Sequence, residues 1–225
     1  MRVAVLIPAL NEEQSLPLVL EELEQLRPGR VIVVDNGSTD RTAELAREHG
    51  AEVVSEPRRG YGSACLAGLA WLERDPPDIV VILDADFSDH ADDMPLLLRP
   101  ILKDEADMVL GERVSLAAPG ALLPNQLFGN KLATYLIRRW TGWTYVDMGP
   151  FRALRWESLM SLHMRDIAYG WNVEMQMKAV HAGLRIQEVP VRYRVRGGGR
   201  SKISGTVKGT VKAGIGILKA CWTYK

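Results

Sequence analysis

Two aspartates that follow an apolar run carry the clearest chemical signal in the sequence. Asp84-Ala85-Asp86 comes directly after residues 79–83, a run typical of a strand buried on both faces. Carboxylates at positions i and i+2 of an extended backbone lie on the same side of the chain. Two such carboxylates suit Mg²⁺ or Mn²⁺, because these ions take phosphate oxygens and water as their remaining ligands. The spacing therefore predicts that Asp84 and Asp86 bind a divalent cation.

Polar residues also follow two earlier apolar runs. The run 3–7 continues into Pro8-Ala9-Leu10-Asn11-Glu12, and the run 31–34 continues into Asp35. An acid at the tip of a strand can hydrogen-bond a ribose or a base. Because ligands of parallel sheets bind at the carboxyl ends of the strands, we expect these residues to share one polar site with the two aspartates.

A glycine pair provides a candidate phosphate contact. Gly60-Tyr61-Gly62 opens a predicted helix directly after Arg58-Arg59, and N–H groups at the start of a helix attract phosphate. The spacing differs from GxGxxG and the pair follows the third predicted strand, which argues against a Rossmann-type NAD site. No GxxxxGK[ST] sequence occurs, which excludes a P-loop.

The hydropathy pattern predicts a scaffold that brings these strand ends together. Short apolar runs alternate with helical periodicity throughout residues 1–113. The expected strands are 3–8, 31–34, 53–54, 79–83 and 107–110, and the expected helices are 13–26, 40–49, 62–73 and 92–102. This alternation predicts an α/β fold with a mostly parallel central sheet flanked by helices.

Residues 114–225 have a different pattern. Proline and glycine predict a loop over 115–124, and 151–154 is a short candidate strand. Helices are expected over 125–140, 171–182 and 203–222. No repeat or linker separates the two parts of the chain, so we expect a single domain over 1–225 with two functional halves.

The formal net charge of zero hides a division between these halves. Residues 1–113 carry 23 acidic and 11 basic side chains, whereas residues 114–225 carry 5 and 17. The overall composition, 47% hydrophobic and 25% charged, is that of a soluble globular protein and argues against long disorder, collagen or coiled coil. The asymmetry hints at a division of function.

The sequence also indicates in which cellular compartment the chain is expected. Two cysteines, Cys65 and Cys221, are too few for a disulfide framework or a four-cysteine zinc site. No run of ~18 apolar residues and no signal-peptide pattern occur. We therefore expect a reducing, cytoplasmic location.

The end of the chain is strongly basic. No acid follows Glu188, and Lys208, Lys212 and Lys219 share one side of the predicted helix. This face could be solvated, or it could contact phosphates or an anionic membrane surface. A non-enzymatic module that binds nucleic acid or membrane through this tail would leave the acidic strand ends unexplained, and we expect no nucleic-acid partner.

Taken in order along the chain, these motifs resemble those of family 2 glycosyltransferases, which have the GT-A fold. The resemblance extends from residue 7 to about residue 202 and is strongest to the branch of dolichyl- and polyprenyl-phosphate sugar transferases. The matching segments are Ile7-Pro8-Ala9-Leu10-Asn11-Glu12-Glu13, Val34-Asp35-Asn36-Gly37-Ser38-Thr39-Asp40, Gly60-Tyr61-Gly62-Ser63-Ala64, Asp84-Ala85-Asp86, Gly111-Glu112-Arg113, Asp147-Met148-Gly149-Pro150-Phe151-Arg152 and Ser201-Lys202.

The resemblance implies a role for each candidate residue. Asp86 would be the stronger metal ligand, with Asp84 near metal or nucleotide, and Asp147 would lie near the reacting sugar. Residues 1–113 would form the nucleotide-sugar and metal half, and residues 114–225 the acceptor half. The nucleotide and donor contacts would be Pro8, Ala9, Glu12, Asp35, Gly62, Asp84, Ala85 and Arg113. Arg113, Arg200 and Lys202 would face the donor diphosphate or the acceptor phosphate.

The resemblance further implies a metal-dependent, inverting transfer of a sugar from a nucleotide diphosphate sugar. A sugar-hydroxyl acceptor needs a general base, for which Asp147 is the first candidate. A lipid-phosphate acceptor is already ionised near neutral pH and needs positive charge instead, which the basic tail fits better. Relatives often carry membrane helices that this sequence lacks, but the basic helix could lie on the cytoplasmic membrane face.

One alternative enzyme class is a nucleotidyltransferase acting on a sugar phosphate. Such an enzyme would normally have a Gly-rich basic loop after the first strand, where this chain has Ala9-Leu10-Asn11-Glu12. The sequence leaves open whether the donor carries UDP or GDP, which sugar moves, what accepts it and how the chain oligomerises.

Overall fold

The fold is built on one seven-stranded sheet, in the order β3-β2-β1-β4-β6-β5-β7. The computed structural model describes residues 1–198 and 207–225, without the side chains of residues 207–213. The strands are β1 (Val3–Ala9), β2 (Arg30–Asp35), β3 (Glu52–Ser55), β4 (Ile79–Ile82), β5 (Met108–Ala117), β6 (Arg152–Arg155) and β7 (Ile186–Tyr193). Only β6 runs antiparallel to its neighbours, β4 and β5, so the prediction of a mostly parallel sheet is confirmed.

The central strands are apolar on both faces because helices cover both faces of the sheet. In β1, Leu6 belongs to one apolar cluster, whereas Val5 and Ile7 belong to the other. The first cluster joins the sheet to α3, α6, α7 and the end of α8, and the second joins the opposite face to α1, α2 and α4. This three-layer arrangement leaves the carboxyl ends of the parallel strands open at one edge.

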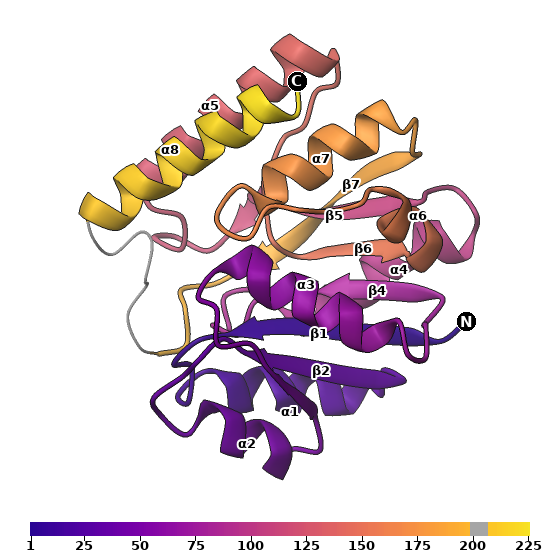
Figure 1. Cartoon of the computed structure of the whole chain (residues 1–225), viewed down its shortest axis with the longest axis vertical. Coiled ribbons are helices and arrows are strands. Elements are labelled where there is room, and N and C mark those ends of the chain that lie inside the picture. The colour runs from indigo at the N-terminus through magenta and orange to yellow at the C-terminus, as the bar shows by residue number, and fades with distance from the viewer. Residues whose placement is uncertain (199–206) are drawn as a thin grey trace.

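The helices follow the predicted order. They are α1 (Leu16–Leu26), α2 (Thr42–Glu48), α3 (Tyr61–Leu72), α4 (Met94–Leu102), α5 (Pro124–Thr141), α6 (Trp156–Ser161), α7 (Trp171–His181) and α8 (Val207–Thr223), with a 3₁₀ turn at Ala91–Asp93. Helices α5 and α8 lie side by side at the outside of the molecule, and both contact α7 (Figure 1).

Several predicted boundaries were wrong for identifiable reasons. The helix expected from residue 13 begins at Leu16, after a turn in which the N–H of Leu16 donates to the carbonyl of Glu12 at 2.8 Å. Pro17, which lacks an N–H, fits the first turn of that helix. The loop expected over 115–124 begins later, because β5 continues to Ala117 by pairing with β7 after a register shift. The first residues of the helix expected over 203–222 lie outside the described residues.

The two halves of the chain share the sheet. Strand β6, from the second half, lies between β4 and β5 from the first half, which agrees with the expected single domain. In the described part of the chain, no helix combines the length and apolar character needed to cross a membrane.

Candidate active site

A cleft of about 330 Å³ lies at the carboxyl ends of β1, β2 and β4. The sequence-predicted residues that line it are Pro8, Ala9, Glu12, Asp84, Ala85 and Asp86. The structure thus brings together the strand ends that the sequence singled out. Asp35 ends β2 beside them, opposite Ala9, and its carboxylate accepts the N–H of Ser38 at 3.0 Å. Asp35 itself is not among the lining residues.

Asp84 is a half-buried residue of the cleft lining, and one of its carboxylate oxygens lacks a partner. Its Oδ1 atom has no hydrogen-bond partner among the described residues. Burial, and then the negative charge of Asp86, raise the pKa of Asp84 to about 7. A buried carboxylate oxygen without a hydrogen-bond partner is costly, so this oxygen favours the arrival of a cation.

Asp86 is held by the loop that follows it. Its Oδ1 atom accepts the N–H of Ser88 at 3.0 Å and also the Ser88 hydroxyl. Its Oδ2 atom faces Arg196, whose guanidinium nitrogen lies 3.7 Å away. The same guanidinium donates to Glu12 at 2.6 Å. A positive side chain therefore lies among the acids of the cleft.

The acids of the cleft fit a divalent cation that is shared with a ligand. No cluster of three or more metal-ligating side chains occurs within the described residues. The unpartnered oxygen of Asp84 and the partly exposed carboxylate of Asp86 provide oxygen ligands of the kind that Mg²⁺ and Mn²⁺ prefer. Such an ion completes its coordination with phosphate oxygens and water.

The glycine pair has a different role from the one expected at Gly62. Gly62 lies outside the cleft lining, and its N–H donates to the carbonyl of Ala168 at 3.3 Å. A Cβ atom at Gly62 would come within 1.9 Å of the Asp166 carbonyl oxygen, so only glycine fits there. Gly60 and Tyr61 line the cleft instead.

Asn36 is a cleft residue that the sequence analysis did not select. Its side-chain amide donates to the carbonyls of Glu56 and Arg58 at 2.9 and 2.8 Å, and its Oδ1 atom accepts the N–H of Gly60 at 2.8 Å. It thereby ties the end of β2 to the loop before α3. Its position beside Asp35 in the Asp-Asn-Gly turn is the signal that could have identified it.

Arg113, within β5, forms a largely buried ion pair with Asp147. The Asp147 carboxylate accepts the Arg113 backbone N–H at 2.9 Å and two guanidinium N–H groups at 2.7 and 2.9 Å. It also accepts the N–H of Met148 at 2.7 Å. Burial alone would raise the pKa of Asp147, but these hydrogen bonds and the charge of Arg113 outweigh burial and hold that pKa below its ordinary value.

A second cavity, of about 350 Å³, lies between α5, α7 and α8. Arg113 forms part of its wall, and much of the rest is apolar, including Leu132, Ala133, Val173 and Ile217. Tyr169 lines both this cavity and the strand-end cleft, so the two adjoin there. Sequence reasoning missed this cavity because three helices from distant parts of the second half form it.

Asp89 is a further buried acid near these groups. It is 2% exposed, and neither of its carboxylate oxygens has a hydrogen-bond partner among the described residues. Burial, and then the charge of Asp84, raise its pKa well above the ordinary value. Arg200 and Lys202, expected at a phosphate, lie outside the described residues.

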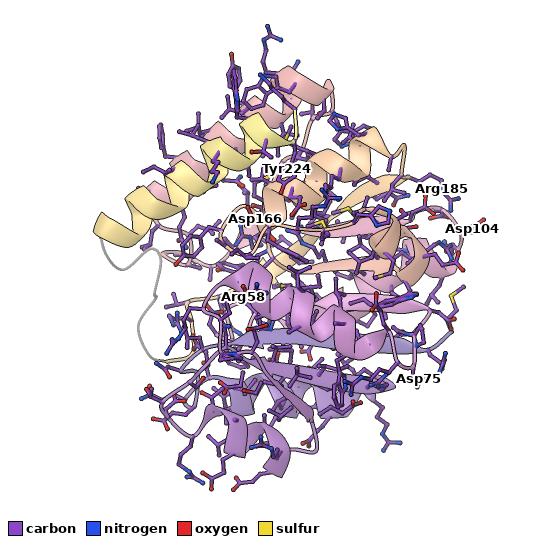
Figure 2. All side chains as sticks on the ribbon, in the orientation of Figure 1. Arg58, Asp75, Asp104, Asp166, Arg185 and Tyr224 are labelled. Atoms are coloured by element: carbon purple, nitrogen blue, oxygen red, sulfur yellow. The ribbon has the colours of Figure 1, made fainter. Side chains whose placement is uncertain are left out.

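Some of the acidic residues that make residues 1–113 negative belong to ion pairs outside the cleft. Figure 2 shows Asp104 and Arg185 next to each other, and neither residue lines the cleft. Arg185 bridges Asp104 and Asp107 there, at 2.8 Å from each carboxylate. These acids stabilise loop ends and take no part in the site.

Comparison with known proteins identifies the class of this site. The chain is 41% identical over 212 residues to an uncharacterized glycosyltransferase of Mycobacterium tuberculosis, with 94% of each chain covered. It is 34% identical to the undecaprenyl-phosphate mannosyltransferase of Micrococcus luteus, covering 93% of this chain and 90% of the relative.

A solved structure shares the fold. It is the glucosyl-3-phosphoglycerate synthase of Mycobacterium tuberculosis in complex with Mn²⁺, UDP-glucose and phosphoglyceric acid. The TM-score is 0.76 at 25% identity, with 98% of this chain and 80% of the synthase covered. The expected GT-A fold is thus confirmed, and a glycosyltransferase replaces the alternatives of a nucleotidyltransferase and a non-enzymatic module. Residues 4–162 match the model of glycosyl transferase family 2, and the chain belongs to that family.

Proposed function

We propose that this glycosyltransferase moves a sugar from a nucleotide diphosphate sugar to a polyprenyl phosphate, with inversion at the sugar and with Mg²⁺ or Mn²⁺. The observation that carries the proposal is the junction of two unlike cavities at Tyr169. One is lined by acids at strand ends, and the other is largely apolar with Arg113 in its wall. The name of the Micrococcus luteus relative supports the lipid-phosphate acceptor, and the Mn²⁺ and UDP-glucose in the mycobacterial synthase support the metal and the donor.

The strand-end cleft would hold the donor. Pro8, Ala9 and Asp35 would contact the base and ribose, with Ala85 lining the same pocket. A divalent cation held by Asp86 and Asp84 would neutralise the charge of the departing nucleotide diphosphate. Glu12 and Arg196, already paired at 2.6 Å, would border the diphosphate. Arg200 and Lys202 remain proposed contacts to the donor diphosphate or the acceptor phosphate.

The apolar cavity would hold the start of the lipid chain, with its phosphate toward Arg113. A phosphate monoester is already largely ionised at neutral pH and needs a cation rather than a base. Asp147 fits this chemistry as the group that orients Arg113, because its oxygens accept four N–H bonds from Arg113 and Met148. The same contacts, together with a lowered pKa, make Asp147 a weak candidate for a general base.

The outer face of α5 and α8 would rest on the cytoplasmic surface of an anionic membrane. Neither helix contains an acid. Among the side chains that the structure describes there, the exposed large apolar ones are Phe128, Tyr135, Ile215, Leu218 and Trp222, and the exposed basic ones on or next to the helices are Lys131, Arg138, Arg139, Lys219 and Lys225. Aromatic and basic residues on one face are the pattern of helices that bind at a membrane interface. Because both helices line the apolar cavity, this contact would place the cavity beside the lipid.

The test is a transfer assay with matched acceptors. UDP- and GDP-sugars are incubated with undecaprenyl phosphate or with undecaprenol, and the product is measured by mass spectrometry. We expect transfer to the phosphate only, abolition by EDTA, and an anomeric configuration opposite to that of the donor by NMR. Equal transfer to undecaprenol, or full activity in EDTA, would contradict the proposal.

A second candidate acceptor is a small molecule that carries both a phosphate and a hydroxyl. The phosphoglyceric acid in the mycobacterial synthase structure favours it. The same assay with phosphoglyceric acid in place of the lipid separates the two. Transfer to phosphoglyceric acid, without transfer to undecaprenyl phosphate, would select the small acceptor.

A further inference from the structure

The loop that carries Asp86 has an unusual backbone conformation. Phe87 has a φ of 63°, in the left-handed region that bulky residues rarely adopt. The loop then turns so that the Ser88 N–H and hydroxyl reach the Asp86 carboxylate. The orientation of Asp86 therefore depends on a conformation that residues 86–89 would not favour by themselves, and contacts from outside must hold it.

Arg194, just past the end of β7, supplies those contacts. Its Nε atom donates to the Phe87 carbonyl at 2.6 Å, and its Nη2 atom donates to the Asp89 carbonyl at 3.0 Å. Its backbone N–H donates to the Ser88 carbonyl at 2.9 Å. One residue thus binds three successive carbonyls of the loop.

The same guanidinium also fixes the side chain at the strained position and anchors the loop to α1. It lies 3.3 Å from the centroid of the Phe87 ring, over its face. Its Nη2 atom donates to Glu22 of α1 at 2.8 Å, and the same Glu22 oxygen accepts the N–H of Ala91 at 3.0 Å. The planar fork of arginine can make these bonds together, which a lysine ammonium cannot.

We propose that Arg194 is a positioning residue that holds Asp86 in the orientation required to bind the divalent cation. This inference rests on the proposed metal-dependent function, because Arg194 would act on the metal only through the loop. It touches the carbonyls behind the carboxylate, and none of its contacts is to a cleft acid. Residues that orient metal ligands from behind typically change metal affinity 10–100-fold when removed.

The neighbouring Arg192 provides a matched control. It lies on β7, two residues before Arg194, and pairs with a buried aspartate, Asp93, at 2.6 Å. Its contacts are to Asp93 and Asp92, not to residues 86–89. Arg192→Met and Arg194→Met therefore each remove one guanidinium and its ion pairing to nearby acids, and only Arg194→Met releases the loop.

The test measures Mn²⁺ binding to the whole chain by electron paramagnetic resonance of the free ion, without nucleotide and then with UDP or GDP. Arg194→Met should weaken Mn²⁺ binding about tenfold or more, and Arg192→Met should leave it within twofold of the parent. The direction of the change in Mn²⁺ affinity separates a positioning role from a simple charge effect. Removing a positive charge near a cation site would by itself tighten Mn²⁺ binding. In transfer assays, Arg194→Met should raise the Mn²⁺ concentration for half activity while kcat at saturating Mn²⁺ stays within a few-fold.

Thermal unfolding without metal shows whether the two variants lose similar stability. If Arg194→Met does not fold, Arg194→Lys serves in its place, with an expected loss of Mn²⁺ affinity of about threefold, smaller than that of Met. Unchanged or tighter Mn²⁺ binding in the Arg194 variant, or an equal loss in Arg192→Met, would overturn the inference. Failure of the parent chain to bind Mn²⁺ under any of these conditions would instead overturn the proposed function.

Discussion

The strand-end cleft and the apolar cavity are built in different ways. In the cleft, short loops continue from strands, and backbone groups fix the polar side chains, as with Asn36 and Asp86. In the cavity, side chains of three helices form the wall, and Arg113 is the charged group, fixed by Asp147. The difference suggests a division between chemistry and recognition. Changes in the cleft should affect turnover, and changes around the cavity should affect acceptor binding.

The largest expected effect is at Asp86. Asp86→Asn removes a negative ligand from the proposed metal site and should lower kcat/KM about 1000-fold, equivalent to ~4 kcal/mol of transition-state stabilisation. Binding to anionic vesicles should be unchanged, because α5 and α8 lie elsewhere. Steady-state kinetics and vesicle sedimentation measure the two effects. Asp92→Asn, an exposed acid beyond the same loop, is the control and should stay near parent activity.

A substitution at Asp147 tests the apolar cavity and its proposed role in acceptor binding. Asp147→Asn breaks the buried pair with Arg113 and should lower the free energy of unfolding by about 3 kcal/mol. It should raise the KM for the acceptor about 30-fold while kcat falls less than tenfold, because Arg113 loses its orientation but no base is removed.

The control for this variant is Glu188→Gln. Glu188 accepts the N–H groups of Val146 and Asp147 but does not contact Arg113. Chemical denaturation and transfer kinetics distinguish the two variants. Near-complete loss of kcat in Asp147→Asn with donor binding intact would show that Asp147 is a base and that the acceptor is a hydroxyl.

The proposed membrane face should respond more weakly. Lys219→Glu reverses one exposed charge on α8 and should weaken binding to vesicles that contain anionic lipid about tenfold, since each basic residue contributes ~1 kcal/mol. Lys103→Glu, an exposed lysine after α4 on the other side of the sheet, should change vesicle binding little. Donor binding should be unchanged in both variants. Equal losses in the two would mean that net charge, not this face, governs binding.

The same comparison explains which features were predictable from the sequence. In the sequence, a strand end is recognisable as an apolar run followed by polar residues. For this reason Pro8, Glu12 and the Asp84-Ala85-Asp86 segment were expected at one site, and in the structure they line the cleft. Knowing that each of these residues follows a strand was sufficient to predict that they share one site, because the parallel sheet brings strand ends together.

Residues from distant segments were not predictable in this way. Arg196 was visible only as one base of a basic tail, and its pairing with Glu12 depends on the segment after β7 reaching the loop after β1, although three strands separate β7 from β1 in the sheet. Gly62 was assigned to phosphate because helix starts often bind anions, but the segment 166–168 occupies its amide and its surface. The local sequence pattern identified which side chains and backbone groups could bind a ligand. Contacts between distant segments determined which of them face the cleft.

The last expected effect concerns the balance between stability and function at Asp84. In the metal-free chain, Asp84→Asn should stabilise the fold by about 1 kcal/mol at pH 8, because it removes a negative charge with one buried oxygen that lacks a partner. The pKa of Asp84 is raised from 3.8 to about 7 in the folded chain. Between these values the folded state binds more protons than the unfolded state, so stability falls as the pH rises.

The gain from Asp84→Asn should therefore be greatest at pH 8, should shrink as the pH falls below 7, and should disappear below 3.8, where the carboxyl becomes protonated in both states. Thermal unfolding in EDTA across this pH range measures it. Transfer activity should fall in the same variant, since the charge that destabilises the empty cleft is the charge proposed to bind the cation. A destabilised Asp84→Asn chain at pH 8 would mean that this carboxylate is already compensated and that the cleft gives up no stability for its function.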